Sequence, residues 1–488
     1  MRKILFASLL IVSFSINAQD KDKRNAEIQK EVIRILDSIN KSKLVKETVS
    51  SETTSDEGSD EGSDEGTVAK TATKVISKDS LKEVVEEHSM KFDALNEQLS
   101  GMQGILDKLS KIKISGYIQA QYESYDTWNA GVHGLVTDKI QTTNSFSLRR
   151  ARIKFTYEPL DGVNLVLCPN FEIDRVRLTD VYVQLNDRWL NTFSLWVGLF
   201  NRPSYEVEYS SASREFAERT LMTRTLYPQE RDQGAKLEAN FLTQYEIPLK
   251  IQVAVLNGNF GLGESKNQVK DVDNTKDLMA RAVYSLKFPS KGLGIDFGGL
   301  GYLGNNKVIT QTTPPAVFTD VNGNKFTPVV GDNLKKEWFG GEMQVYYDFL
   351  GGTSFKSEYV RGTISGFKNT DFPAQVNPLF NANKVRNIEG YYFSFIKNVG
   401  KEHMLSARFD VFDPNTKKSG DEVDTIDDLK YHNWTFAYQY FFNENIKIML
   451  SYLMPINEKS SNSAITNPDY ANVDHKDNIL TLRFQARF

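Results

Sequence analysis

Three cationic side chains stand two residues apart in one short stretch, SFSLRRARIKFTYEP, which begins at Ser145. In a β-strand, residues two apart point to the same face, so Arg150, Arg152 and Lys154 would lie in a row with about 7 Å between neighbours. The residues between them are apolar, which suits a strand with a lipid side and a water side. Arginines in such a row bind oxyanions through forked hydrogen bonds, so the stretch predicts an anion path on the water side.

The same alternation places more cations on the inward, water-facing side of other predicted strands: Lys236, Arg281, Lys287, Arg408, Lys447, Arg483 and Arg487. Arg149 falls on the apolar side, where we expect its long side chain to snorkel or sit at the rim. Two interpretations of the inward cations remain open. Either they face the solution and attract anions, or they pair with inward acids, of which the sequence offers Glu172, Asp180, Glu238, Glu342 and Asp410.

One long connection between predicted strands, residues 201–232, is the most highly charged in the chain. It holds six acidic residues and five arginines, Arg202, Arg214, Arg219, Arg224 and Arg231. A long third connection can fold into a sixteen-stranded barrel and narrow its lumen, and we expect this one to do so. The alternative is an external cap held by salt bridges. The mixed charge argues against a simple attraction of every anion.

Residues suited to catalysis or metal binding are few and scattered. None of the five histidines stands in a recognisable Ser/His/acid arrangement; they are His88, His133, His403, His432 and His475. No spacing of histidines or cysteines resembles a metal site, and the one cysteine, Cys168, can form no internal disulfide. We therefore predict no enzymatic activity, no bound metal and no cofactor.

The strands that must position the inward cations begin near residue 112, where the apolar period becomes two. Sixteen strands are predicted, near 114–124, 146–157, 163–174, 177–187, 193–201, 233–243, 248–258, 277–288, 294–304, 336–348, 353–362, 387–397, 402–411, 431–442, 446–455 and 478–488. Short and long connections alternate between them, except for a short one near Arg175, and this asymmetry is typical of outer-membrane barrels. The predicted fold class is an all-β transmembrane barrel of about 16 antiparallel strands over residues 112–488. A soluble β-propeller would need a repeat of about 40–50 residues, which is not seen.

The outward faces of these strands are rich in apolar and aromatic residues, as a lipid-facing surface requires. They include Phe193, Leu195, Val197, Leu199, Ile251, Val253, Val255, Tyr391, Phe393, Phe395, Trp434, Phe436, Tyr438 and Tyr440. The chain ends on a similar strand, NILTLRFQARF, with Leu480, Leu482, Phe484, Ala486 and Phe488 on one face. A soluble sandwich could use such faces as its core, but sixteen strands joined by hairpin turns would make an unusual sandwich.

Three unlike segments precede the predicted barrel. Residues 1–18 have the basic start, apolar stretch and small final residue of a secretory signal peptide. Residues 19–77 hold a short amphipathic helix and the acidic repeat SDEGSDEGSDEG, which predicts a solvated linker. Residues 78–111 carry an apolar seam with alternating spacings of 4 and 3, which favours a self-associating coiled coil over an isolated helix. The seam consists of Leu81, Val85, His88, Phe92, Leu95, Leu99, Met102, Leu106 and Leu109.

Charge and hydropathy limit the possible function classes. The 488 residues have a net charge of −4 and a mean hydropathy of −0.43. Beyond the N-terminus, no apolar run approaches the roughly 20 residues of a membrane helix, which excludes a helical membrane protein after processing. The charge excludes a basic nucleic-acid binder. Residues 112–488 hold 42 basic and 43 acidic residues, so any anion preference must come from where the charges lie.

The barrel segment resembles a known family, the phosphate-selective porins O and P. The resemblance rests on SFSLRRARIKF, VGLFNRPSYEVEYSSASREFAERTLMTRTLYPQERDQGAKL, ARFDVFDPNT, YQYFFNENIKIML and the terminal LRFQARF. It implies a sixteen-stranded homotrimer in the outer membrane, whose inward loop meets an arginine-lined path for anions. The positions it carries over are Arg150, Arg152, Arg224 and Arg231. The terminal aromatic residue resembles the signal that the barrel-assembly machinery recognises.

Together these features predict an outer-membrane porin of a Gram-negative bacterium. It would let small hydrophilic solutes diffuse passively, with a preference for anions such as phosphate. The predicted anion path consists of Arg150, Arg152, Lys154, Arg224, Arg231, Lys236, Arg281, Arg408 and Arg483. The alternative is a general porin whose periplasmic coiled coil tethers the outer membrane to the cell wall or to a partner. The expected partners are small anionic solutes, outer-membrane lipid, two further copies of the chain and, during assembly, the barrel-assembly machinery.

Overall fold

The computed structural model describes residues 90–488 apart from several gaps. The gaps are 92–93, 95–96, 101, 104–105, 107, 127–142, 174, 229, 259–270, 272–273, 309–314, 367–382, 463–472 and 475–476, together with the side chain of residue 426. The chain divides into two compact units, Met1–Met90 and Lys91–Phe488. The predicted signal peptide, the acidic linker and the first half of the heptad seam lie outside the described residues. No described helix is long and apolar enough to cross a membrane.

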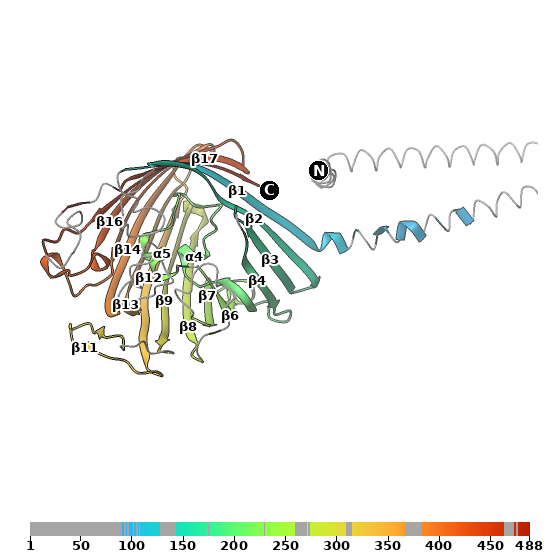
Figure 1. Ribbon diagram of the computed structural model, residues 1–488. Coiled ribbons are helices and arrows are strands. Elements are labelled where there is room, and N and C mark those ends of the chain that lie inside the picture. The colour runs from blue at the N-terminus through green and yellow to red at the C-terminus, as the bar shows by residue number, and fades with distance from the viewer. Residues whose placement is uncertain are drawn as a thin grey trace, which may run out of the picture. The chain divides into compact units, whose positions relative to one another are not determined.

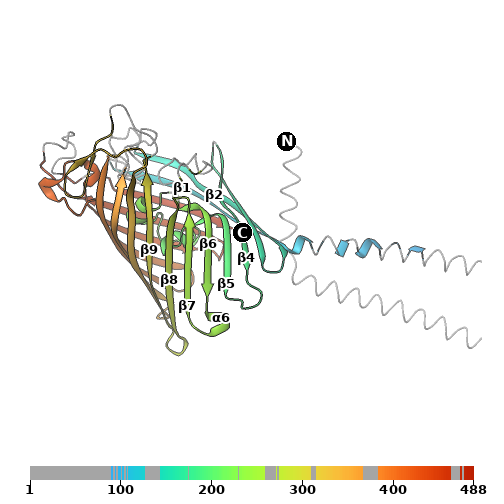
Figure 2. The same ribbon diagram turned by 90° about the horizontal axis from the view of Figure 1, so that it is seen from below.

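The described residues of the second unit form one closed antiparallel barrel of sixteen strands (Figures 1 and 2). The strands are β1 Ile112–Tyr125, β2 Asn144–Leu160, β3 Val163–Phe171, β4 Val176–Asn186, β5 Phe193–Asn201, β6 Arg231–Asn240, β7 Leu249–Leu256, β8 Asp277–Phe288, β9 Leu293–Lys307, β12 Asn333–Tyr347, β13 Thr353–Gly366, β14 Lys384–Val399, β15 His403–Asp413, β16 Tyr431–Phe441, β17 Ile446–Asn457 and β18 Ile479–Arg487. Each strand pairs with the next along the chain, and β18 pairs with β1. The predicted fold class is therefore confirmed.

The connections contain only short elements among the described residues. They are α4 Tyr205–Glu208, α5 Leu221–Leu226, α6 Leu242–Tyr245, η2 Pro289–Lys291, η4 Gly420–Glu422, η5 Ile426–Asp428 and a hairpin of β10 Phe318–Thr319 with β11 Lys325–Phe326. Each of the sixteen predicted strands overlaps a barrel strand, and the connection near Arg175 is short as predicted. The β10–β11 hairpin is the described pairing that the sequence analysis missed. Its two-residue strands are too short to show a period.

The last residue closes the barrel against the first strand. Phe488 and Gly116 exchange two backbone hydrogen bonds of 3.0 Å each, next to the β1–β18 ladder. A Cβ atom on Gly116 would lie 2.6 Å from Cζ of the Phe488 ring and 2.5 Å from the backbone oxygen of Arg152. Glycine is therefore required here, because only a residue without a side chain leaves room for the terminal ring.

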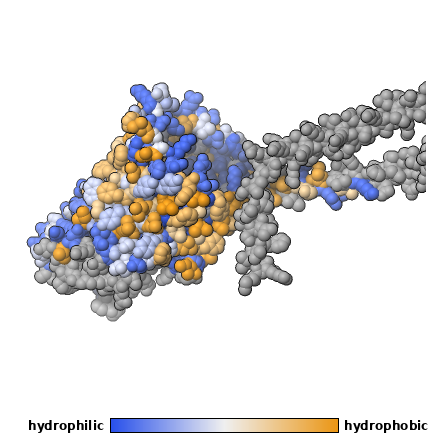
Figure 3. Space-filling view, turned by 90° about the horizontal axis from the view of Figure 1, so that it is seen from above, coloured by the Kyte–Doolittle hydropathy of each residue, from blue (hydrophilic) through white to orange (hydrophobic). Residues whose placement is uncertain are grey.

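The outer face of the barrel is apolar, in the alternation predicted from the sequence. Exposed outward side chains include Phe193, Leu195, Val197, Val253, Val255, Phe393, Phe395, Trp434, Phe436, Tyr438, Leu480, Leu482 and Phe484. Figure 3 shows apolar residues spread over one outer face of the barrel. On the last strand, the alternate residues Thr481, Arg483 and Gln485 are buried inside. Contact with lipid is favourable for an apolar surface of this extent, whereas contact with water is not.

One part of the barrel interior is filled by a hydrophobic core. Helix α5 contributes Met222 and Leu226 to this core, and Val207 of α4 joins them. The wall contributes inward residues of β7, β8, β9 and β12 to β15, namely Ala254, Leu256, Met279, Leu300, Tyr302, Trp338, Val360, Ile364, Ile388, Tyr392 and Phe412. The strand alternation predicts a water-facing side inside the barrel. The interior is apolar here because these side chains pack against other side chains instead of facing water.

Trp338 lies at the centre of this core and connects the wall to the end of α5. Its ring stacks on Tyr302 with centroids 4.0 Å apart, and it meets the Tyr227 ring edge-on at 5.7 Å. Its indole Nε1 donates a hydrogen bond of 3.0 Å to the Tyr227 hydroxyl. The ring packing and the hydrogen bond therefore both fix Tyr227, directly after α5, to the barrel wall.

We expect Trp338→Ala to lower the free energy of unfolding by about 3–5 kcal/mol, because it leaves a large cavity in a packed core. The midpoint of thermal unfolding in detergent measures this effect. Trp434→Ala is the matched control, since Trp434 is partly exposed on the outer face. An equal loss of stability in both variants would contradict a packed core inside the barrel.

Candidate functional site

The connection between β5 and β6, residues 202–230, lies inside the barrel, and we call it the inward loop. Figure 1 shows its two helices, α4 and α5, surrounded by the strands. The loop closes at its base, where the Arg202 backbone N–H donates to the Glu230 carbonyl over 3.0 Å. The prediction that this connection folds inward is confirmed by its contacts with inward side chains of the wall.

Local hydrogen bonds give the inward loop its own structure. Thr220 caps α5, because its hydroxyl accepts from the Thr223 backbone N–H. The Glu206 carboxylate accepts from the Thr220 backbone N–H at 2.9 Å and from its hydroxyl at 2.6 Å. Arg219 donates to the carbonyls of Glu206 and Val207, at 2.7 and 2.9 Å. The two helices are thereby fixed to each other, independently of the wall.

Side chains of the wall opposite β5 and β6 bind the backbone carbonyls of the loop. Arg483 of β18 donates to the Ala217 carbonyl at 2.6 Å, and Arg408 of β15 donates to the Glu218 carbonyl at 3.0 Å. Further donors of β1, β16, β17 and β18 bind other carbonyls of the loop; they are Gln119, Gln439, Lys447 and Gln485. The loop therefore crosses the lumen and is anchored on its far side.

Glu218 is the main charged anchor of the inward loop. Arg149 donates to its two carboxylate oxygens from Nε and Nη2, at 2.8 and 2.9 Å. Arg483 donates to it at 2.8 Å, and Arg150 lies at 3.7 Å. Burial alone would raise the pKa of Glu218, but the surrounding guanidinium groups outweigh burial and hold this pKa well below its ordinary value. The carboxylate is therefore ionised at neutral pH.

The position of Arg149 corrects the sequence analysis, which placed it on the apolar side or at the rim. The pairing of β1 with β2 shifts by one residue, so that Gln119 faces Arg150 while Ala120 faces Leu148. Arg149 is the extra residue of this β-bulge, and a bulge turns a side chain away from the regular alternation. The bulge lets two consecutive arginines reach the same carboxylate. Sequence alternation alone could not show it.

A second ion-pair cluster lies around Glu208 of α4. Its carboxylate accepts from Lys236 of β6 at 3.2 Å and from Arg281 of β8 at 2.8 Å. Arg281 also forms a forked pair with Glu342, with distances of 2.8 and 2.7 Å. The Lys236 ammonium lies 4.0 Å from the centre of the Trp196 ring. The predicted path residues Lys236 and Arg281 are thus both engaged by carboxylates.

The pairing alternative is confirmed for three of the predicted inward acids. Asp180 pairs with Arg231 at 2.8 Å, Glu342 with Arg281 at 2.7 Å, and Asp410 with Arg408 at 3.4 Å. Glu172 pairs with two arginines that were not among the predicted path residues, Arg175 and Arg177. Glu238 accepts from an uncharged side chain, that of Gln252.

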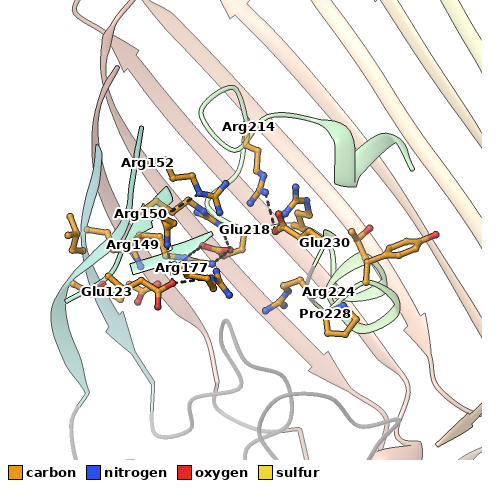
Figure 4. A pocket seen from close by; sticks show the side chains of 18 of the residues that line it. Glu123, Arg149, Arg150, Arg152, Arg177, Arg214, Glu218, Arg224, Pro228 and Glu230 are labelled. Atoms are coloured by element: carbon orange, nitrogen blue, oxygen red, sulfur yellow. Dashed lines mark hydrogen bonds and ion pairs between the residues drawn. The ribbon is translucent and has the colours of Figure 1, made fainter. Parts of the chain in front are cut away.

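A cavity of about 470 Å³ remains between the inward loop and the wall of β1, β2, β3 and β4 (Figure 4). Eight arginines and four glutamates line it, an excess of four positive charges. The arginines are Arg149, Arg150, Arg152, Arg177, Arg214, Arg219, Arg224 and Arg231, and the glutamates are Glu123, Glu172, Glu218 and Glu230. Behind the lining, Asp180 pairs with Arg231, and Arg483 pairs with Glu218.

The cavity brings together four of the nine predicted path residues, namely Arg150, Arg152, Arg224 and Arg231. Lys236 and Arg281 lie in the Glu208 cluster, and Arg408 and Arg483 bind the inward loop from outside the lining. Lys154 does not line the cavity. Arg177, Arg214 and Arg219 also line the cavity, although no individual role was predicted for them. Alternation from the inward Asp180 would place Arg177 outside, but the β3–β4 pairing shifts by one residue between Cys168 and Pro169. Within the described residues, no group of three or more His, Cys, Asp or Glu side chains could hold a metal ion.

Comparisons with known proteins add little to this geometry. No family model and no curated protein matches the chain. Among solved structures, it resembles OprB of Pseudomonas putida (12% identity, 79% of this chain, 96% of that chain, TM-score 0.47). It also resembles an anion-selective porin from Comamonas acidovorans (11%, 77%, 99%, 0.46) and OmpT of Vibrio cholerae (11%, 77%, 97%, 0.45). At such scores the likenesses carry no argument about function.

We expect Glu218→Gln to lower the free energy of unfolding by about 3–5 kcal/mol, because it leaves buried guanidinium groups without their carboxylate. The pH dependence gives a second readout. The native pKa is lowered, so the stabilisation is complete above about pH 4.5 and is lost as the pH falls through the native pKa. Thermal unfolding in detergent at pH 3 to 8 measures both effects.

The control for this prediction is Glu172→Gln, since Glu172 holds no part of the inward loop and is less buried. It should cost clearly less stability than Glu218→Gln. If the Glu218 variant kept the acid-dependent loss of the wild type in full, the carboxylate would not be the anchor.

Proposed function

We propose that the chain is an outer-membrane porin through which small hydrophilic solutes diffuse passively, with a preference for anions. The arginine-rich cavity is the main support for this proposal, because its lining has an excess of four positive charges and it lies inside a closed barrel. Confined positive charge raises the local concentration of anions and repels cations of similar size. The pairs around Glu208 reduce the positive field elsewhere in the barrel. Asp180 offsets the charge of Arg231 at the cavity, where the lining arginines still outnumber the lining glutamates.

The membrane location is supported by the outer face of the barrel and by the ends of the chain. Exposed apolar side chains alternate along β5, β7, β14, β16 and β18, and outer-membrane lipid is the solvent that suits them. Because the number of strands is even, the start of β1 and the end of β18 lie at the same end of the barrel. This is the end with the short turns, which would be the periplasmic end. We further propose that residues 1–18 are a signal peptide and that Phe488 is part of the signal read by the barrel-assembly machinery.

Phosphate is the first named candidate among the anions. Forked guanidinium groups match the oxygens of phosphate, and the resemblance to the phosphate-selective porins O and P supports the same choice. That resemblance also supports a homotrimer.

We expect purified protein in planar bilayers to show a reversal potential on the anion side under a salt gradient. Arg224→Gln should reduce this selectivity, because it removes one of the positive charges that line the cavity. Lys335→Gln is the matched control, since Lys335 is exposed and lies outside the cavity. A channel without anion preference would leave only a general porin, and the absence of conductance would reject the porin function.

A second role is favoured by the helical residues just before the barrel. Leu99, Met102, Leu106 and Leu109 lie in helical positions, and between 52% and 62% of each side chain is exposed in the single chain. Apolar residues at heptad positions require a partner helix in water. We propose that this segment forms a periplasmic coiled coil, through which the porin also tethers the outer membrane to the cell wall or to a periplasmic partner.

We expect deletion of residues 20–110 to leave conductance unchanged and to abolish retention of the protein on cell-wall material during detergent extraction. The full-length chain is the control in both assays. Loss of conductance in the shortened chain would show that the segment is needed for the channel itself. Unchanged retention would reject the tether.

A further inference from the structure

The inward loop carries one arginine whose hydrogen-bonding groups are not used by the protein. Arg214 is buried, with 5% of its surface exposed, and it lines the cavity (Figure 4). None of its three guanidinium nitrogens has a hydrogen-bond partner among the described residues. Its Nη2 lies 3.6 Å from Oε1 of Glu230, which is an ion-pair distance rather than a hydrogen bond. Buried polar groups are normally satisfied, so these donors point to a ligand.

Arg152 faces the same cavity and adds to this donor set. It donates to two uncharged acceptors, Oδ1 of Asn170 and Oγ of Ser211, each at 3.3 Å. These hydrogen bonds orient its guanidinium group without neutralising its charge. Arg214 and Arg152 therefore present positive charge to the cavity from two sides, one from the inward loop and one from β2.

The size of the cavity argues against a single inorganic ion as its best ligand. Its volume of about 470 Å³ is far larger than the roughly 30 Å³ that one water molecule takes up in the liquid. It falls within the range of about 300–1,000 Å³ that is usual for pockets enclosing organic ligands. An inorganic phosphate would touch one side of the cavity and leave the remaining arginines to water.

The loop itself shows which anionic group these arginines accept. Glu218 and Glu230 enter the cavity from the inward loop, and each is bound by arginines. Arg149 holds Glu218 through a fork of two parallel hydrogen bonds, the arrangement that suits a carboxylate. Two carboxylates are thus accommodated at once, and an excess of four positive charges still remains. A ligand with several carboxylates would neutralise this remaining positive charge.

We propose that the cavity binds one organic acid with two or more carboxylate groups, and that Arg214 is a principal contact of this ligand. The proposal deepens the anion preference and rests on the proposed function. Hydroxyl groups of the lining, from Ser145, Ser147, Thr223 and Thr225, can bind the polar middle of such a molecule. The multivalent charge of the ligand matches the excess charge of the lining, which a monocarboxylate cannot do.

The test compares citrate, succinate, acetate and inorganic phosphate at constant ionic strength, because salt screens such interactions. Block of the ion current is measured in planar bilayers, and binding is measured by titration calorimetry on the full chain in detergent. We expect citrate to bind and block at concentrations at least tenfold lower than acetate or phosphate. The concentration at which succinate binds and blocks should fall between those of citrate and acetate.

Arg214→Gln should weaken the binding of citrate at least tenfold and change the affinity for acetate by less than threefold. Arg487→Gln is the matched control, because it removes the same charge from an exposed position outside the cavity. This variant should change the affinity for citrate by less than twofold. Arg214→Lys is a second variant that keeps the charge but loses the fork, and it should give an intermediate affinity. It also covers the case in which the glutamine variant does not fold.

The outcomes separate this proposal from the porin function. Equal affinity for citrate and acetate, stronger binding of phosphate than of citrate, or wild-type citrate binding in both Arg214 variants would overturn the proposal. Anion-selective current with any of these results would leave the porin function standing. Citrate binding that depends on Arg214, in a protein without conductance, would instead support the site and reject the porin.

Discussion

The ion pair between Glu218 and the arginines around it determines where the inward loop crosses the barrel. A carboxylate and guanidinium groups can be buried together only when their charges meet in good geometry. Arg149 and Arg150 supply one side of this contact from β2, and Arg483 supplies the other from β18. These strands flank β1 where the barrel closes. The loop is therefore anchored where the barrel closes, away from its origin between β5 and β6, and the rest of the interior is arranged around that crossing.

The crossing divides the interior into two unlike parts. On one side, α5 packs against inward apolar residues of the wall, with Trp338 and Tyr227 at the centre. That core is closed to water because its side chains are in contact. On the other side, the loop leaves a cavity whose lining is mainly charged. The hydrophobic effect and the charge pairs thus act on opposite faces of the same loop, and the arginine-rich cavity lies on the charged face. A second cavity of about 370 Å³ lies beside Glu208 of α4.

Much of the barrel could be predicted from the sequence, because a period of two runs through most of the strands and turn residues separate them. The inward direction of Arg152 and Arg483 follows from the same rule. Two features did not follow from it. The bulge at Arg149 breaks the alternation at one residue, and Trp338 looks like any inward position until α5 is known to pack on it. The partners of each arginine depend on residues far apart in sequence, such as Glu218 and Arg483, and no periodicity reports them.

The central claim is that solutes pass on the arginine side of the inward loop and not through the apolar side. Single cysteines at Ser147, which lines the cavity, and at Ala254, which lies in the core, can test it in a Cys168→Ser background. The measurement is the rate at which a membrane-impermeant anionic thiol reagent reduces the current of each variant. The account predicts rapid reaction at position 147 and none at position 254. Rapid reaction at position 254, or none at position 147, would contradict it.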